Sequence, residues 1–334
     1  MLSRDQLRQL IHLEYSEAET LDLLGQLTPD HITPALFSDA LACLQETALP
    51  LAVPSVPVMD CCGTGGSGLP HFNTSTTVAF ILAAAGIPVV KFGNRGFSSA
   101  SGSFDLLAQL GFSERMDLHR IPEVLAQCGL VFLFAPQCYP QLAGFNQLRR
   151  TLKTRTLFNF LGPLLNPVKP AYRLLGVSHP GMQQRMADYL ISTGTCERGW
   201  IVNAESGLDE LDIHGNTQVL QLEQNRVSEI TLSPSDFSAN FSSDALSKNS
   251  HHELPPNAHR PTENLKIFMR LLQGDDDQSP YYDMVCLNAG AGLLIAQKTP
   301  TLKEGIQEAK QILKSGKALH TLEQCRRVNE QFAC

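Results

Sequence analysis

The sequence of 334 residues predicts an α/β fold: a small, mostly helical domain beside a large domain with a mainly parallel central sheet flanked by helices. Short apolar segments alternate with segments of helical periodicity, which is typical of a parallel sheet covered on both faces. Hydrophobic residues make up 43% of the chain and charged residues 18%, as in globular proteins with a packed core. The length suits one large domain together with a smaller one.

The first part of the chain predicts short helices followed by strands and helices in alternation. Residues 3–48 carry apolar side chains at helical spacing, and the proline-rich stretch 49–59 predicts a linker. Strands are expected within VPVMDCC, IPVVKFG and LVFLFAP, and helices within STTVAFILAAAG and SASGSFDLLAQLG.

The second part of the chain first returns to helical or loop sequence, at residues 139–170. The strand pattern resumes in YRLLGVSHP and RGWIVNA. Residues 231–262 are polar and poor in core residues, which predicts a surface excursion. Two final helices are expected, one over DMVCLNAGAGLLIA and one over LKEGIQEAKQILKSGKALHTLEQC.

Charge and composition exclude several classes of protein. A net charge of -7 argues against a nucleic-acid-binding protein with a broad basic face. The start, MLSRDQLRQL, lacks the apolar region of a secretory signal, and the longest apolar run is about half of what a membrane-spanning helix needs. The nine cysteines form no CxxC pair, which favours reduced thiols over zinc ligands. We therefore expect a cytoplasmic protein with no membrane or nucleic-acid partner.

A glycine-rich loop, DCCGTGGSG, follows the first expected strand. Glycine allows positive φ angles and close approach of a ligand to the backbone, and successive N–H groups then bind an anion. The segment NTSTTVAF opens the next helix, where Asn, Ser or Thr can cap the N-terminus and free N–H groups favour phosphate. A phosphorylated ligand is expected here, although a glycine-rich turn without a ligand would have the same composition.

A second polar cluster, VVKFGNRGFSSASGSFD, follows the next expected strand. It carries Lys91, Asn94 and Arg95 together with several serines. Because the carboxyl ends of parallel strands meet at one edge of the sheet, we expect this loop and the glycine loop to flank one polyphosphate. The alternative is a solvated loop.

Two further clusters carry weaker signals. Adjacent carboxylates at Asp209 and Glu210 can hold Mg²⁺, which binds through one or two carboxylates and substrate phosphates, but such pairs are common on surfaces. Arg149, in LRRTLKTRTLFNFLGPLLNP, can clamp a carboxylate in a bidentate fork, although most arginines are only solvated.

Taken together, the motifs resemble those of the anthranilate phosphoribosyltransferase family, which shares its fold with the pyrimidine nucleoside phosphorylases. The resemblance covers nearly the whole chain in the family's order. It is carried by GTGGSG, FNTST, KFGNR, SGSFDLLAQLG, TLFNFLGPLLNP, GLDEL and CLNAGAGLLIA.

The resemblance implies an organisation and an activity. Residues 1–52 and 139–168 would form the small helical domain, and 53–138 and 169–334 the large α/β domain, with the active site in the cleft between them and a homodimer as the assembly. The reaction implied is the Mg²⁺-dependent transfer of the 5-phosphoribosyl group from phosphoribosyl diphosphate (PRPP) to anthranilate. It gives N-(5-phosphoribosyl)anthranilate and diphosphate in tryptophan biosynthesis.

The resemblance also assigns residues to the site, position by position, without naming an acid or base. The residues matching the family's donor contacts are Gly63, Thr64, Gly65, Gly66, Asn73, Ser75, Thr76, Lys91 and Ser103. Those matching its acceptor site are Gly63, Asn94, Arg149, Gly162 and Pro163. Those matching its Mg²⁺ sites are Ser75, Asp209 and Glu210.

The chain departs from the family pattern mainly on the acceptor side. Phe92 and Tyr139 occupy positions where the family usually has histidine, while Ser67 replaces an aspartate of the glycine loop and Ala100 a basic residue of the serine-rich loop. With these changes, the acceptor of the phosphoribosyl group could be an aromatic compound other than anthranilate. A nucleoside phosphorylase and a non-catalytic, nucleic-acid-binding relative are further alternatives. The Asp-Glu pair argues against the first, and the intact glycine loop and negative charge argue against the second.

Overall fold

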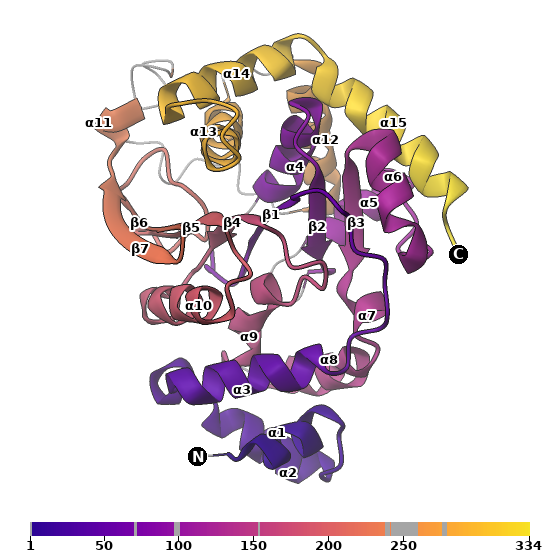
Figure 1. Ribbon diagram of the computed structural model, residues 1–334, viewed down its shortest axis with the longest axis vertical. Helices are drawn as coiled ribbons and strands as arrows, with labels where there is room; N and C mark the ends of the chain where they lie inside the picture. Colours follow the sequence, from indigo (N-terminus) through magenta and orange to yellow (C-terminus); the bar gives the residue numbers. More distant parts are fainter. Residues whose placement is uncertain are drawn as a thin grey trace.

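The computed structural model describes residues 2–69, 72–96, 101–152, 154–237, 241, 260–275 and 279–334, except for the side chains at 146, 149 and 150. In this part of the chain a sheet of seven strands crosses the molecule in the order β3-β2-β1-β4-β5-β6-β7 (Figure 1). The first five strands in this order pair in parallel, and the last two are added antiparallel. The strands are β1 Met59–Gly63, β2 Val89–Gly93, β3 Leu130–Phe134, β4 Tyr172–Gly176, β5 Arg198–Ala204, β6 Thr217–Glu223 and β7 Arg226–Leu232.

The register of the parallel strands places several loops at one edge of the sheet. Gly63, the last residue of β1, pairs with Gly176, the last residue of β4. Gly93, the last residue of β2, pairs with Phe134, the last residue of β3. The loops that follow these strands therefore begin side by side, as the sequence predicts. The predicted α/β class with a mainly parallel sheet is confirmed.

Helices cover the sheet on both sides (Figure 1). On one side, α4 packs against β1 and α13 packs against β4, while α10 packs against β5 and β6 on the other side. Both α4 and α13 are buried around most of their circumference, which explains their nearly unbroken apolar sequences. The helices of this part are α4 Thr74–Ala84, α5 Ser103–Gln109, α6 Ile121–Cys128, α10 Pro180–Thr193, α11 Pro234–Phe237, α12 Pro261–Gln273, α13 Pro280–Ile295, α14 Leu302–Lys314 and α15 Lys317–Gln331, with the 3-10 turn η2 Leu118–Arg120.

The N-terminal helices and α8 lie together at the opposite end of the molecule from α14 (Figure 1). Ser3 and Ser16 each form a capping box at the start of α1 and α2, so these short helices begin where the sequence supplies a cap. The elements here and in the connection to the sheet are α1 Arg4–Ile11, α2 Glu17–Gln26, η1 Pro29–His31, α3 Pro34–Gln45, α7 Ala135–Cys138, α8 Gln141–Thr151, α9 Phe158–Leu161 and η3 Gly162–Leu164. The predicted division into 1–52 with 139–168 and 53–138 with 169–334 stays a prediction.

The structure corrects the expected ending of the chain. The segment predicted as one helix over residues 302–325 is two, α14 and α15, because Ser315 ends the first and Gly316 has a left-handed φ of 72°. A helix cannot continue through that conformation, which glycine adopts at little cost.

The structure also contains a β-hairpin that the sequence analysis did not predict. Strands β6 and β7 are joined by Gln224 and Asn225, both with positive φ, which suits a two-residue hairpin turn. The predicted surface excursion at 231–262 lies largely outside the described residues. Among the residues that are described, no helix combines the length and the apolar character needed to cross a lipid bilayer.

Candidate functional site

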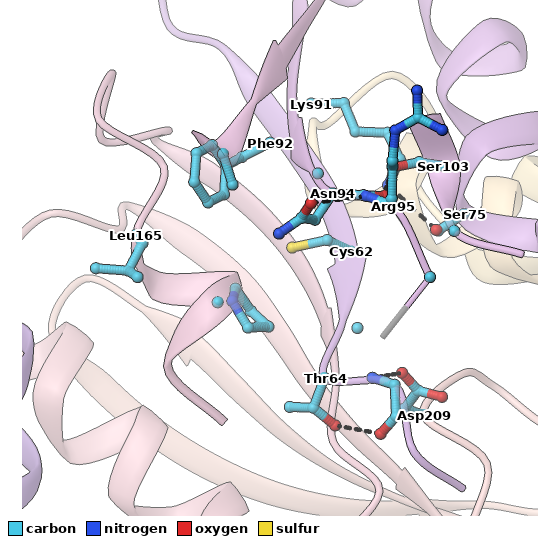
Figure 2. Close-up of a pocket in the computed structure, with 18 of the residues that line it drawn as sticks. Cys62, Thr64, Ser75, Lys91, Phe92, Asn94, Arg95, Ser103, Leu165 and Asp209 are labelled. Atoms are coloured by element: carbon cyan, nitrogen blue, oxygen red, sulfur yellow. Dashed lines mark hydrogen bonds between the residues drawn. The ribbon is translucent and has the colours of Figure 1, made fainter. Parts of the chain in front are cut away.

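A cleft of about 280 Å³ opens at the carboxyl ends of β1 and β2 (Figure 2). Its walls come from the loops after these strands, the start of α4, the β5–β6 loop and the segment of α9 and η3. All of the predicted site residues except Gly66 and Arg149 line it. These are Gly63, Thr64, Gly65, Asn73, Ser75, Thr76, Lys91, Asn94, Ser103, Gly162, Pro163, Asp209 and Glu210.

The two exceptions have different causes. Gly66 belongs to the glycine loop but does not line the cleft. Arg149 lies in α8, and its side chain is outside the described part of the structure. Ala100, which replaces a basic residue of the family's serine-rich loop, also lies outside the described residues, so this replacement has no structural account.

The glycine loop is held by hydrogen bonds on both sides of Gly65. Its N–H donates to Asp209 Oδ2 at 2.7 Å, and its carbonyl accepts from Arg155 Nη2 at 3.0 Å and from Ser178 Oγ at 2.6 Å. Gly65 and Gly66 have φ angles of 67° and 76°, which side chains rarely permit. A Cβ at Gly63 would lie 2.1 Å from Asp209 Oδ2, so glycine is required there by close approach.

The start of α4 presents polar groups to the cleft. Asn73 precedes the helix, but its side chain does not cap it as the sequence suggests; its Nδ2 instead donates to Ser101 Oγ and to Asn264 Oδ1, each at 3.2 Å. Thr76 Oγ1 is buried and has no hydrogen-bond partner among the described residues. The N-terminus of a helix carries partial positive charge, so this end of the cleft suits an anion.

Lys91 supplies a fixed positive charge at the base of the cleft. The side chain is only 2% exposed, and its Nζ donates to the carbonyl of Cys61 and to Ser75 Oγ, the latter at 3.1 Å. Nearby, Ser103 Oγ donates to the carbonyl of Asn94 at 3.3 Å, which ties the start of α5 to the end of β2 (Figure 2). The ammonium is thus immobilised beside the glycine loop.

The acidic pair lies in the β5–β6 loop, and both of its residues line the cleft (Figure 2 shows Asp209). Burial, and next the negative charge of Asp209, raise the pKa of Glu210 to about 8. Glu210 Oε2 is buried and has no hydrogen-bond partner among the described residues. Asp209 and Glu210 line the same cleft as the Ser75 hydroxyl, and one Glu210 oxygen has no hydrogen-bond partner among the described residues. Together they are an oxygen donor set that fits Mg²⁺, which takes its remaining ligands from water and substrate phosphates.

The other half of the cleft is apolar. It is formed by Leu142, Phe158, Leu161 and Leu165 together with Phe92. The Phe92 ring packs edge to face on Tyr139, whose hydroxyl donates to the carbonyl of Leu165 at 2.7 Å. Gly162 and Pro163, in η3, also line the cleft. The cleft therefore joins a polar half, whose groups suit an anion and a metal ion, to a half suited to a flat apolar group.

Buried polar residues beneath the cleft support its wall. Asn166 Nδ2 donates to Asp60 Oδ2 and to the Val90 carbonyl, each at 2.8 Å, and Arg173 Nη1 donates to the Pro163 carbonyl at 3.2 Å. Asp60 is fully buried, and burial raises the pKa of its carboxyl despite the nearby charge of Lys91. The network fastens the segment after η3 to strands β1 and β2.

Sequence reasoning missed several of these residues. Ser178 follows the end of β4 and could have been found by the same strand-end argument that selected the other loops. Arg155 stands in the basic stretch before FNFLGP and carried no signal that separated it from its neighbours. The sequence carries no signal for Asp60 or Asn166 either, because each lies in a segment whose pattern predicts only a strand or a loop.

Comparison with known proteins agrees with this architecture. Residues 55–319 match the model of the glycosyl transferase family, a/b domain. An anthranilate phosphoribosyltransferase of Pseudoalteromonas translucida (strain TAC 125) is 41% identical over 287 residues, covering 86% of this chain and 77% of that protein. One from Shewanella sp. (strain MR-7) is 38% identical over 330 residues, covering 96% and 90%.

Solved structures show the same relationship. The crystal structure of anthranilate phosphoribosyltransferase from Thermus thermophilus superimposes with a TM-score of 0.83 at 34% identity, covering 99% of this chain and 96% of that one. The enzyme from Saccharomyces cerevisiae in complex with PRPP and Mg has a TM-score of 0.85 at 25% identity, covering 98% and 92%. From its sequence and its fold, the chain belongs to the glycosyl transferase family and, within it, to the anthranilate phosphoribosyltransferases, which are pentosyltransferases.

Proposed function

We propose that the protein transfers the 5-phosphoribosyl group of PRPP to the amine of anthranilate in a Mg²⁺-dependent reaction of tryptophan biosynthesis, giving N-(5-phosphoribosyl)anthranilate and diphosphate. The observation that carries the proposal is the pairing, in one cleft, of an anion-binding half with an apolar half. The first contains the glycine loop, Lys91 and the acidic pair. The second offers a flat apolar surface of the kind that an aromatic acid needs.

The donor half supports loss of diphosphate from C1 of the ribose. As that C–O bond loosens, positive charge grows on the ribose ring and negative charge on the leaving diphosphate. Lys91, the N–H groups of the glycine loop beyond Gly65 and those at the start of α4 are held in place before the substrate arrives, so they stabilise the negative charge without reorganisation. Thr76 Oγ1, buried and unpartnered among the described residues, is a further donor on this side.

The metal is proposed to bind at the acidic pair. Asp209, Glu210 and Ser75 are the residues that would hold Mg²⁺, and the ion, when bound, would neutralise charge on the diphosphate. Asp209 is engaged with the Gly65 N–H in the structure. The same carboxylate therefore links the metal position to the donor loop.

The acceptor half positions the amine and excludes water from it. Phe92, Phe158 and Leu165 shield the cleft, while Asn94 and Arg149 are assigned to orient the acceptor on the resemblance described above. An arylamine is neutral at pH 7 and its lone pair is free, so the reaction needs positioning of the nucleophile more than a strong general base.

The test is to mix the purified protein with PRPP, Mg²⁺ and anthranilate and to follow the loss of anthranilate fluorescence. The decay should require all three components and should slow by about 100-fold or more in Asp209→Ala, since one charge-stabilising group is then lost. Asp188→Ala is the matched control, because Asp188 is exposed on α10 and bonded only locally to Gln184. A decay that persists without Mg²⁺ or in Asp209→Ala would contradict the metal assignment.

A second candidate, the same donor chemistry with a different aromatic acceptor, is favoured by one observation. Phe92 and Tyr139 form a buried aromatic contact where the family usually has histidines. No decay of anthranilate fluorescence, with PRPP binding still measurable by calorimetry, would select this candidate. Absence of PRPP binding would contradict both candidate functions. Phosphate-dependent cleavage of a nucleoside would identify a phosphorylase instead.

A cytoplasmic location and a homodimeric assembly complete the proposal. The first rests on the nine cysteines, whose spacing favours reduced thiols, and the second on the resemblance to the family. Sedimentation velocity at several protein concentrations tests the assembly, and a single monomeric species at all of them would contradict it.

A further inference from the structure

The Gly65 carbonyl accepts from two side chains that come from distant parts of the chain, in addition to the hydroxyl of its neighbour Thr64 at 3.2 Å. Arg155 Nη2 lies 3.0 Å and Ser178 Oγ 2.6 Å from this oxygen, and Arg155 Nη2 also lies 2.7 Å from Ser178 Oγ. We propose that Arg155 is a positioning residue that orients the glycine loop for the diphosphate of the donor by fixing the Gly65 carbonyl. This inference rests on the proposed function, because it assigns a role in binding PRPP.

The geometry of the peptide bond explains how a carbonyl contact orients a donor. The carbonyl of Gly65 and the N–H of Gly66 belong to one planar trans peptide, so they point in opposite directions. When Arg155 and Ser178 hold the carbonyl, the N–H of Gly66 faces away from them. Two consecutive glycines with left-handed φ have many other accessible conformations, so an external contact is needed to select this one.

Arg155 is itself held rigidly enough to do this. Its guanidinium stacks over the Phe160 ring, with Cζ 4.6 Å from the ring centroid. Burial lowers the pKa of the guanidinium, and the nearby charge of Asp209 opposes that effect. A Cβ at Gly66 would lie 2.9 Å from Arg155 Nη2, so loop and guanidinium fit closely. Arg155 does not line the cleft, which is why its action on the substrate has to pass through Gly65.

Arg155 also connects the donor loop to the acceptor wall. It lies in the short segment between α8 and α9, where the N–H of Leu157 donates to the Leu27 carbonyl at 2.7 Å. The next residue, Phe158, begins α9 and lines the apolar half of the cleft. One segment thus contacts the donor loop, the N-terminal helices and the aromatic wall, and Arg155 is its contact with the donor loop.

The experiment compares Arg155→Gln, Arg155→Lys and Ser178→Ala with the unchanged protein. Removing a charged donor from a partly buried carbonyl should raise the KM for PRPP and the calorimetric Kd for PRPP with Mg²⁺ by about 10-fold in Arg155→Gln. Arg155→Lys should recover part of the loss, because lysine keeps the charge but not the planar stack. The KM for anthranilate should change by less than about 2-fold in all three.

Arg185→Gln is the matched control, since Arg185 also donates to backbone carbonyls, those of Ile32 and Gly181, but away from the glycine loop. It should leave both KM values unchanged. Amide hydrogen exchange gives a readout that needs no turnover: exchange in residues 63–69 should accelerate in Arg155→Gln and not in Arg185→Gln.

The outcomes separate this inference from the proposed function. If the unchanged protein does not bind PRPP, the proposed function fails. If it binds PRPP and folded Arg155→Gln binds it equally well, or if both KM values rise together, the positioning role is overturned. Should Arg155→Gln fail to fold, Ser178→Ala decides, because it removes the other distant donor to the same carbonyl, leaves that of Thr64, and should show the same selective rise.

Discussion

The ring of Phe92 packs edge to face against the ring of Tyr139, with 5.9 Å between centroids and 84° between planes. Tyr139 is 1% exposed and its hydroxyl is bound to the Leu165 carbonyl, so the pair is a fixed part of the apolar wall. The Phe92 ring lines the cleft, as Figure 2 shows, and Tyr139 packs against that ring without lining the cleft itself. Two positions at which the chain departs from the histidines of the family pattern thus form one packed contact.

Phe92→His tests whether this change costs the enzyme a catalytic base. We expect kcat to change by less than about 3-fold, far from the ~100-fold that a general base contributes, because the arylamine needs no deprotonation before attack. Phe92→Leu is the control for loss of the aromatic ring. Steady-state assays with anthranilate measure both variants, and a gain of about 100-fold in Phe92→His alone would contradict the mechanism proposed above.

Asn166→Ala should destabilise the protein by about 3 kcal/mol, because it leaves the Asp60 carboxylate and the Val90 carbonyl buried without their shared donor. Unfolding in urea measures the loss. Asn216→Ala is the matched control, since Asn216 donates to a carboxylate on the surface, Glu205, and should cost about 0.5 kcal/mol or less. Equal losses in the two variants would show that burial of the Asn166 contact is not what matters.

Gly176→Ala should disrupt the acidic pair. A Cβ at Gly176 would lie 1.5 Å from the backbone oxygen of Asp209, so the β5–β6 loop has to move. We expect Mg²⁺-dependent turnover to fall by about 100-fold or more, measured with saturating PRPP and anthranilate over a range of Mg²⁺ concentrations.

Gly25→Ala is the matched control, because a Cβ at this position of α2 would meet no atom of the described residues within 4 Å outside the helix's own backbone. It should raise the free energy of unfolding by about 0.5–1 kcal/mol and leave turnover unchanged. If Gly176→Ala retained normal turnover, Asp209 would not need its observed position.

Glu46 makes stability depend on pH in a defined range. It accepts from Arg8 Nε at 3.0 Å and from Arg4 Nη2 at 2.7 Å, and these hydrogen bonds lower its pKa from 4.5 to about 2. Because the folded-state pKa lies below the ordinary value, the stabilisation is fully present above pH 4.5 and is lost as the pH falls through about 2. Glu46 is 44% exposed, so screening by water limits the effect to less than about 1 kcal/mol at pH 7.

The measurement is the difference in unfolding free energy between Glu46→Gln and the unchanged protein, taken in urea at pH 7 and at pH 3. The difference should shrink at the lower pH and with added salt. Glu323→Gln, at an exposed position of α15, is the control and should show no such trend. A difference that grows towards pH 3 would contradict the assignment.

The features that depend on local physics could be predicted from the amino-acid sequence. Alternating apolar and helical segments indicated the parallel sheet, since each strand and helix must bury its own apolar face. The glycines at 65 and 66 indicated a loop with positive φ, and the polar residues after β1 and β2 indicated the place of the cleft, since parallel strands end at a common edge.

The distant side chains that complete the site follow instead from tertiary packing. The contact of Asp209 with the Gly65 N–H spans 144 residues, that of Asn166 with Asp60 spans 106, and that of Arg155 with Gly65 spans 90. No local spacing encodes such pairs, because they depend on the order in which strands enter the sheet and on the closeness of packing between them. The break at Gly316 differs, because its glycine is a local signal that the helical periodicity of 302–325 concealed, and both helices it separates pack against α4.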